Sequence, residues 1–280
     1  METVWVQSLG SGSAGNALVF HAGGRAVLID HGISPRALRT ALAIHGLAPA
    51  DLDAILITHE HTDHVHGLRA GLLTTACPVV GTEGTLAHLP TTRGRSLVAG
   101  PGQSLAIGTW EITALPVSHD AAAPSGFSVV SHGVRCTVLT DLGERSGMAG
   151  EYLAASDLLV IEANHDAAML RSGPYPAHLK SRIASGRGHL SNDQAGTWLG
   201  DVLGESSAPR LVWLAHLSQT NNRPGVAVEA VTRAASASGA DLRPVALPRR
   251  QAGPVWRPAD PLPVGTARIP RQMSLSLPTA

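Results

Sequence analysis

A dense cluster of metal-binding side chains follows an apolar run in this chain. Residues 54–64 read AILITHEHTDH, a buried-strand pattern followed by three imidazoles and a carboxylate. These ligand types suit zinc, manganese and iron. Side chains alternate along an extended chain, so His59 and His61 can chelate one ion, while Asp63 and His64 lie past a bend and can face a second. A solvated histidine-rich loop is the alternative, but the spacing favours a two-metal site at a strand's carboxyl end.

The rest of the chain predicts a large α/β domain. Hydrophobic residues make up 44% of it and charged residues 15%, which is enough for a sizeable core and argues against disorder. Apolar runs and turn residues predict strands at 3–9, 17–20, 26–29, 54–57, 78–80, 104–107, 110–117, 126–131, 134–139, 157–161 and 210–215. Helical spacing predicts helices at 35–45, 66–73, 82–89, 147–154, 175–185, 191–203 and 223–238. Mixed sheets covered by helices on their outer faces fit this order.

The ends of the chain differ in character from its middle. The N-terminus has no basic segment followed by an apolar stretch, and no apolar run is long enough for a membrane span. We therefore expect a soluble, cytoplasmic protein without a membrane partner. From residue 248 the sequence becomes rich in Pro and Arg, so we expect one domain over 1–247 and a flexible tail over 248–280.

Charge and cysteine content exclude several classes of site. Formal net charge is zero, so the chain lacks the overall basic charge of a tight nucleic-acid binder, although a local basic patch stays open. Cys77 and Cys136 form no C-x-x-C pair, which argues against a disulfide framework or a cysteine zinc site. Nothing in the sequence indicates an oligomeric state.

The motif H-x-H-x-D-H after an apolar strand resembles the signature of the metallo-β-lactamase superfamily. That resemblance implies a four-layer αββα sandwich of two mixed sheets with a dinuclear site on one edge. It also implies further ligands after later strands, and the segments SHD at 118–120, TDLG at 140–143 and AHLS at 215–218 match them in order. The first metal would be held by His59, His61, His119 and Asp141, and the second by Asp63, His64, Asp141 and His216.

Two other segments resemble the RNase Z group within this superfamily. EAN at 162–164 and GHLSN at 188–192 match a Glu and a His that form a proton-relay pair there. A carboxylate beside an imidazole favours the protonated ring, so His189 held by Glu162 could protonate a leaving oxygen. The alternatives are a strand-end carboxylate bonded to backbone and an ordinary residue near a helix start.

The wider string of motifs resembles the YycJ/WalJ-like branch, over about residues 5 to 240. The quoted strings are SLGSGSAGN, LIDHGIS, VSHDAAAPSGF, GPYPAHLKSRI and LAHLSQTNN. Members of that branch are regarded as exonuclease-like phosphodiesterases acting on DNA. The 75-residue spacing from Asp141 to His216 leaves no room for the cap domain of larger nucleases in this superfamily. Asp30, in LID, matches an aspartate that buttresses the site, with a turn-forming residue as the alternative.

The expected activity is metal-dependent hydrolysis of a phosphodiester in nucleic acid, DNA first, or in a small molecule. Two divalent ions, zinc first and manganese as the alternative, would share the attacking hydroxide. Asp63, Glu162 and His189 are the expected catalytic side chains. Candidate substrate contacts are Ser11, Ser13, Asn16, Lys180, Arg182 and Asn221. Two alternatives stay open: a hydrolase of a thioester, lactone or cyclic phosphate, and a non-catalytic metal-binding protein.

Overall fold

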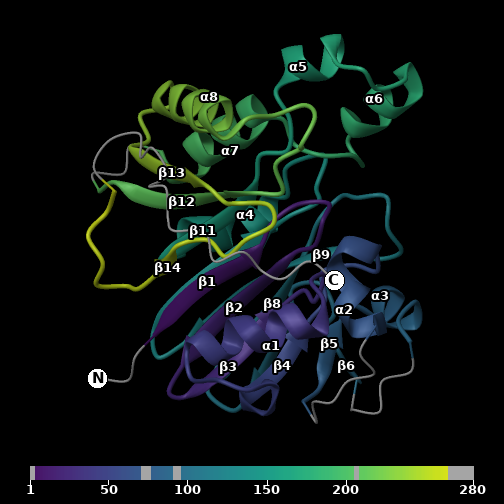
Figure 1. Ribbon diagram of the computed structural model, residues 1–280. Coiled ribbons are helices and arrows are strands. Elements are labelled where there is room, and N and C mark those ends of the chain that lie inside the picture. The colour runs from purple at the N-terminus through teal and green to yellow at the C-terminus, as the bar shows by residue number, and fades with distance from the viewer. Residues whose placement is uncertain (1–3, 71–76, 91–95, 205–207, 264–280) are drawn as a thin grey trace.

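The computed structural model describes residues 4–70, 77–90, 96–204 and 208–263. Two seven-stranded sheets lie face to face with helices on both outer sides (Figure 1), which confirms the expected αββα sandwich. The first sheet has the order β14-β1-β2-β3-β4-β5-β6 and the second β13-β12-β11-β10-β9-β8-β7. In each sheet one half is antiparallel and the other half is parallel.

The strands and helices have the following bounds. The first sheet contains β1 (Trp5–Gly10), β2 (Ala17–Ala22), β3 (Arg25–Ile29), β4 (Leu52–Leu56), β5 (Val79–Gly81), β6 (Ser96–Val98) and β14 (Val255–Trp256). The second contains β7 (Ser104–Ile107), β8 (Trp110–Pro116), β9 (Ser125–Ser131), β10 (Val134–Leu139), β11 (Leu158–Glu162), β12 (Arg210–Ala215) and β13 (Leu242–Ala246). The helices are α1 (Pro35–Ile44), η1 (Pro49–Asp51), α2 (Thr62–Ala70), α3 (Glu83–Ala87), α4 (Gly147–Ala154), α5 (Ala167–Ser172), α6 (Ala177–Ile183), α7 (Asn192–Leu203) and α8 (Pro224–Ser236).

Three apolar layers hold the sandwich together. The central layer lies between the two sheets and contains large buried side chains such as Phe20, Trp110 and Trp213. One outer layer packs α1 and α2 on the first sheet, and the other packs α4, α7 and α8 on the second. The inner strands are covered on both faces, which explains why they read as continuous apolar runs.

Local signals place the helices that flank the site. Ser34 caps α1 by accepting a hydrogen bond from the Ala37 N–H, and Pro35 occupies the first turn. Ser191 and Gln194 form a capping box at the start of α7. Helix α2 begins at Thr62, four residues earlier than expected, so Asp63 and His64 lie in its first turn.

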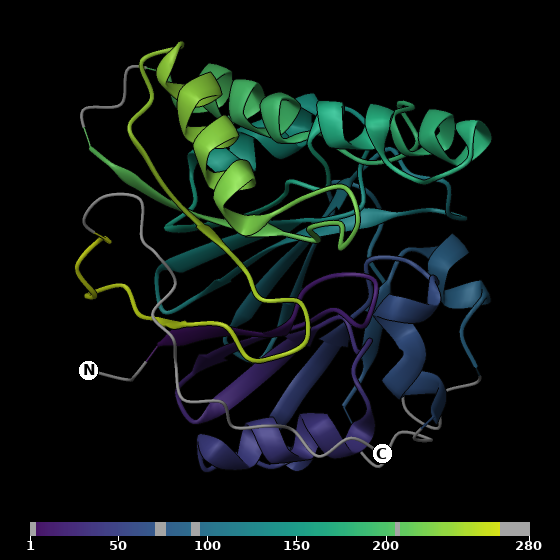
Figure 2. The same cartoon turned by 45° about the horizontal axis from the view of Figure 1, so that its top comes forward.

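The segment expected to be a flexible tail begins at residue 248, and its described part contacts the sandwich. Strand β14 pairs antiparallel with β1, and Trp256 is buried. The Arg249 guanidinium donates to the Leu217 and Ser218 carbonyls, which ties the segment to the loop after β12. These bonds and the buried indole attach residues 249–256 to the sandwich (Figure 2), whereas 264–280 lie outside the described residues.

No described helix is both long and apolar enough to cross a bilayer. Both cysteines are buried, and no disulfide joins them.

Candidate metal centre

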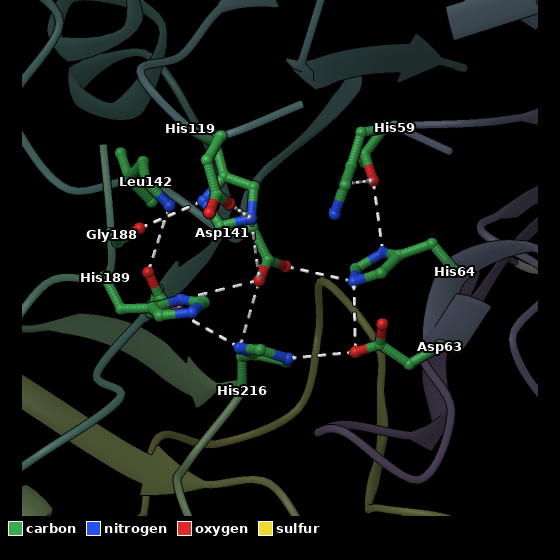
Figure 3. Close-up of polar contacts among 12 residues, drawn as sticks. His59, Asp63, His64, His119, Asp141, Leu142, Gly188, His189 and His216 are labelled. Carbon is green, nitrogen blue, oxygen red and sulfur yellow. Dashed lines mark hydrogen bonds and ion pairs between the residues drawn. The ribbon is translucent and has the colours of Figure 1, made fainter. Parts of the chain in front are cut away.

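The predicted ligands converge because of strand direction. Strands β3 and β4 are parallel, and β8 runs the same way as β10, β11 and β12, since two antiparallel pairings separate β8 from β10. The carboxyl ends of all these strands therefore meet at one edge of the sandwich. The residues that follow them point toward a common centre (Figure 3).

One group of donors consists of three imidazoles. Candidate ligand atoms of His59, His61 and His119 all lie within 4.8 Å of one another. The Nδ1 of His119 is 3.0 Å from the Gly188 carbonyl oxygen, which can only accept, so this nitrogen carries the proton and Nε2 keeps its lone pair. The Nε2 of His59 is buried and has no hydrogen-bond partner in the part of the chain that the structure describes. A buried nitrogen without a partner is costly, and a cation would satisfy it.

A second group combines Asp63, His64 and His216, again within 4.8 Å. Asp63 Oδ2 lies 3.3 Å from His216 Nε2 and 3.6 Å from His64 Nε2. The opposite nitrogen of His64, Nδ1, is 2.7 Å from Asp30 Oδ2. This carboxylate fixes the ring with its Nε2 toward the centre, which is the arrangement found behind metal-bound imidazoles.

Asp141 lies between the two groups. Its Oδ2 is 3.1 Å from His64 Nε2, and its Oδ1 is 3.3 Å from His216 Nδ1 and 4.0 Å from His119 Nε2. Asp141 Oδ2 lies within ion-pair distance of His64 but accepts no hydrogen bond from the described residues. This buried oxygen is therefore available to a cation. Asp141 can therefore face both donor groups.

Backbone strain accumulates around these side chains. Asp30, Asp141 and His216 have φ values of 59°, 56° and 53°, in the left-handed region that non-glycine residues seldom adopt. Each lies one or two residues after the end of a strand, and the turn in the chain directs its side chain into the site. Such conformations cost about 1–3 kcal/mol each and persist only where the surroundings hold them.

The electrostatics of the centre call for positive charge. Burial raises the pKa of Asp141, but His216 and His64 outweigh it, and the pKa lies well below its usual range. Burial lowers the pKa of His64 and His216, but the facing carboxylates, Asp30 and Asp141 for His64 and Asp141 foremost for His216, raise it well above normal. Protonation of these rings balances the negative charge of the carboxylates, and divalent cations would balance it equally.

The first donor group behaves differently. Burial lowers the pKa of His59 and of His119, so both rings stay neutral, which is the form that binds metal. Neutral imidazoles on one side, carboxylates on the other and buried donor atoms without partners fit divalent metal ions.

Glu162 and His189 form a pair beside this centre. Glu162 is fully buried, and its Oε1 lies 2.8 Å from His189 Nδ1 and 3.0 Å from His216 Nδ1. Its Oε2 accepts from the Leu142 and Leu190 N–H groups. Both carboxylate oxygens are thus occupied, although Glu162 and His189 also gather within ligand range of Asp141 and His216. The alternative of a carboxylate bonded to backbone is correct for Oε2, while Oε1 holds the imidazole.

The pKa of each partner reflects the pairing. Burial raises the pKa of Glu162, yet His189 outweighs it and the pKa lies below normal. Burial lowers the pKa of His189, yet the Glu162 carboxylate raises it above normal. His189 Nδ1 donates to the carboxylate, and a side chain that is 20% exposed leaves Nε2 for the cavity.

A cavity of about 450 Å³ opens over the centre. Predicted site residues in its wall are Ser13, His61, Asp63, His119, Asp141, Arg182, His189 and His216. A larger cavity of about 790 Å³ lies beside α1 and meets the first at Ala14. The larger one has no His, Asp, Glu or Cys in its wall, so the chemistry belongs to the smaller one.

Four expected substrate contacts do not line the catalytic cavity. Ser11 is buried, and its Oγ accepts from the His216 N–H at 2.9 Å. Asn16 is buried with its Nδ2 3.3 Å from Asp63 Oδ2. Asn221 is buried away from the cavity, and Lys180 Nζ donates to the Arg171 carbonyl. Ser11 and Asn16 therefore position candidate ligand residues.

Several residues around the centre were not predicted. Asn164 Nδ2 donates to the His216 carbonyl at 2.9 Å, and the Arg187 guanidinium donates to the His119 carbonyl. Asp120 Oδ1 lies 3.3 Å from His119 Nε2. His66 lines the cavity one helical turn after Asp63, and this i, i+3 spacing was a readable signal.

Comparison with known proteins decides the family. The model of the beta-lactamase superfamily domain matches residues 25–216. The chain belongs to this superfamily. Exodeoxyribonuclease WalJ of Streptococcus pneumoniae is 34% identical over 221 residues, which are 76% of this chain and 81% of WalJ. Exodeoxyribonuclease YycJ of Bacillus anthracis is 32% identical over 238 residues, 82% of this chain and 89% of YycJ. The expected branch is confirmed.

A solved structure supports the fold independently. The metallo-beta-lactamase fold protein YhfI from Bacillus subtilis superposes with a TM-score of 0.62 and covers 91% of this chain and 99% of its own. At 18% identity the likeness concerns the fold alone.

Proposed function

We propose that this protein is a hydrolase of phosphodiester bonds in nucleic acid, which requires two divalent metal ions. The observation that carries the proposal is the Glu162–His189 pair, 2.8 Å apart, next to two groups of donors with Asp141 between them. The names of the WalJ and YycJ relatives point to DNA and to cleavage from an end.

We assign His59, His61, His119 and Asp141 to one ion and Asp63, His64, Asp141 and His216 to the other. Imidazole and carboxylate donors without thiolate suit zinc first, with manganese as the alternative. Such ions, when bound, supply Lewis acidity toward a phosphoryl oxygen and lower the pKa of water. Asp63 contributes a carboxylate to the second set, and its Oδ2 lies 3.3 Å from His216 Nε2, so both side chains can reach the same ion.

The proton needed by the leaving oxygen would come from His189. Its Nδ1 is held by Glu162, so the ring cannot rotate freely, and Nε2 is directed to the cavity. The buried carboxylate favours the protonated ring, which is the form able to donate. A thioester releases a thiolate, which leaves without a proton donor, whereas a phosphodiester releases a more basic alkoxide that gains from one. The pair therefore favours a phosphodiester over a thioester substrate.

Replacement of His189 tests this assignment. We expect His189→Ala to lose about 10²–10⁴ in turnover, the usual contribution of a general acid, while binding as much metal as the wild type. His88→Ala, at an exposed helix end, serves as the control and should keep full turnover. Loss of metal equal to the loss of turnover would make His189 a ligand and overturn its assignment.

The substrate class needs a direct comparison. Metal-loaded protein would be incubated with end-labelled single- and double-stranded DNA and RNA, a chromogenic phosphodiester, a thioester and a β-lactam. We expect cleavage of the phosphodiesters, DNA foremost. Turnover of the thioester or lactam alone would establish the small-substrate alternative, and full metal content without any turnover would establish a non-catalytic protein.

A further inference from the structure

One surface segment has a charge unlike that of the whole chain. Residues 167–188 contain Arg171, Lys180, Arg182 and Arg187 but no Asp or Glu, in a protein whose formal net charge is zero. His178 lies in the same segment. Of the side chains at 167–187 only Leu170 is buried, so the positive charge is presented to solvent. We call residues 167–188 the basic arm.

The basic arm stands apart from the layers of the sandwich. Helices α5 and α6 extend beyond the edge of the second sheet, away from α1 on the opposite side (Figure 1). Helix α6 buries none of its residues, so apolar packing does not account for its presence. A solvated helix face with one sign of charge is typical of a surface that meets an oppositely charged partner.

The base of the arm is attached to the metal centre. Ser118 Oγ donates to the Gly186 carbonyl at 2.7 Å, and His119 Nδ1 donates to the Gly188 carbonyl. Gly143, two residues after Asp141, approaches the Gly186 backbone so closely that a Cβ there would lie 2.4 Å from it. The carboxyl end of the arm is therefore attached to the loops that carry the candidate ligands His119 and Asp141.

Arg182 connects the arm to the cavity. Its side chain is 59% exposed and belongs to the cavity wall. Asp120 Oδ2 accepts from its Nε at 2.5 Å, which leaves the two Nη groups without a hydrogen-bond partner among the described residues. Guanidinium groups bind phosphate oxygens with such paired N–H donors.

The other charged groups of the arm lie farther out. Arg171 is exposed, and Lys180 Nζ caps the Arg171 carbonyl at 2.7 Å, which keeps the two cations together. Tyr175 lies between Pro174 and Pro176, and its hydroxyl donates to Thr220 Oγ1. Positive charges along a surface, with an aromatic ring among them, are the usual platform for a single nucleic-acid strand. Acidic groups that contact the arm are Asp120, already paired with Arg182, and Glu144 and Asp166.

We propose that the basic arm binds the phosphate backbone of a single nucleic-acid strand and leads it to the metal centre through Arg182. This inference deepens the proposed function and rests on it. A single strand fits better than a duplex, because a cavity of about 450 Å³ has room for about one nucleotide, which must leave its stack to enter.

Binding of a cleavage-resistant strand tests the arm apart from turnover. The probe is a fluorescent phosphorothioate oligothymidylate added to the metal-loaded full chain, with anisotropy read between 0.05 and 1 M salt. The arm variant is Arg171→Gln with Lys180→Gln, and the control is Arg36→Gln with Arg39→Gln, two exposed cations of α1. Both pairs change net charge equally, so only position differs.

We expect the arm variant to reduce the salt slope by about 1.4 and to weaken binding by tens of fold at 0.05 M salt, with convergence near 1 M. The control should bind as the wild type does. Turnover of a small chromogenic phosphodiester should be unchanged in the arm variant, because neither residue lines the cavity.

Equal losses of affinity in the arm and control variants would show that only net charge matters and would overturn the inference. Wild-type affinity in the arm variant would also overturn it, and so would tighter binding of a duplex than of a single strand. Wild-type protein that binds the strand through the arm but cleaves no nucleic acid would instead contradict the proposed function and leave the binding surface standing.

Discussion

Asp30 Oδ2 lies 2.7 Å from His64 Nδ1, and both side chains are buried at the edge where β3 and β4 end. Thr58 donates to Asp30 through its N–H and its hydroxyl, so the carboxylate is held from two sides. Asp30 thus acts on the centre through His64, which makes it a positioning residue, as the resemblance implied.

Replacing Asp30 tests this relationship. Asn tolerates the positive φ of this position, so Asp30→Asn keeps the backbone and removes the negative charge. We expect metal affinity to fall about 10- to 100-fold, the usual cost of losing a partner behind a ligand. Titration with zinc and a competing chelator measures it. Asp193→Asn, exposed on α7, is the control, and equal affinity in the two variants would contradict the prediction.

Removing the metal should destabilise the protein as well as inactivate it. Ions that bind only the folded chain contribute about 2.7 kcal/mol at 100 times their Kd, which corresponds to roughly 5–10 °C in Tm for a domain of this size. We therefore expect a chelator to lower Tm by that amount in differential scanning fluorimetry. The same chelator saturated with zinc should have no effect. An unchanged Tm after full metal loss would show that the donors do not depend on the ions for stability.

Gly32 provides a steric test of the centre. A Cβ at this position would lie 1.7 Å from the Asp63 carbonyl oxygen, so Gly32→Ala must displace the start of α2. We expect a loss of at least about 1–3 kcal/mol in the free energy of unfolding, together with weaker metal binding. Gly147→Ala, where nothing lies within 4 Å of the added Cβ, should be neutral or slightly stabilising. Urea unfolding of both variants decides, and similar stability of the two would refute the steric argument.

His31 should make stability depend on pH. Burial lowers its pKa to about 4, and neither ring nitrogen has a hydrogen-bond partner among the described residues. The unfolded chain takes up a proton near pH 6.5 and the folded chain does not, so stability is full above about pH 6.5 and declines as pH falls toward 4. We expect roughly 2 kcal/mol of loss between pH 7.5 and 5 from this residue.

The variant His31→Leu isolates this contribution. As the pH is lowered from 7.5 to 5, the free energy of unfolding of this variant should fall by roughly 2 kcal/mol less than that of the wild type. His88→Leu, at an exposed helix end, should keep the wild-type slope. Parallel curves for wild type and His31→Leu would mean that His31 takes up its proton without cost.

Strands β6, β13 and β14 and helix α5 were not predicted from the sequence, and each omission has a physical cause. Strand β13 contains Pro244, which weakens a strand pattern but is tolerated at a sheet edge. Strand β6 has three residues, and α5 has six, too few for a periodic signal. Strand β14 exists because β1 offers an edge to pair with, and composition alone predicted flexibility there.

The sequence by itself determined the family, the αββα order of elements and the residues that gather at the centre. Most of these residues lie in the loops that follow apolar strands, and strand direction brings such loops to one edge. Only the tertiary structure decided what supports them. Ser11 contacts His216 across 205 positions and Asn16 contacts Asp63 across 47, so no local pattern distinguishes a buttress from a substrate contact. The position of the basic arm was decided in the same way, since its charge was readable in sequence but its attachment to the loops of His119 and Asp141 depends on contacts between distant segments.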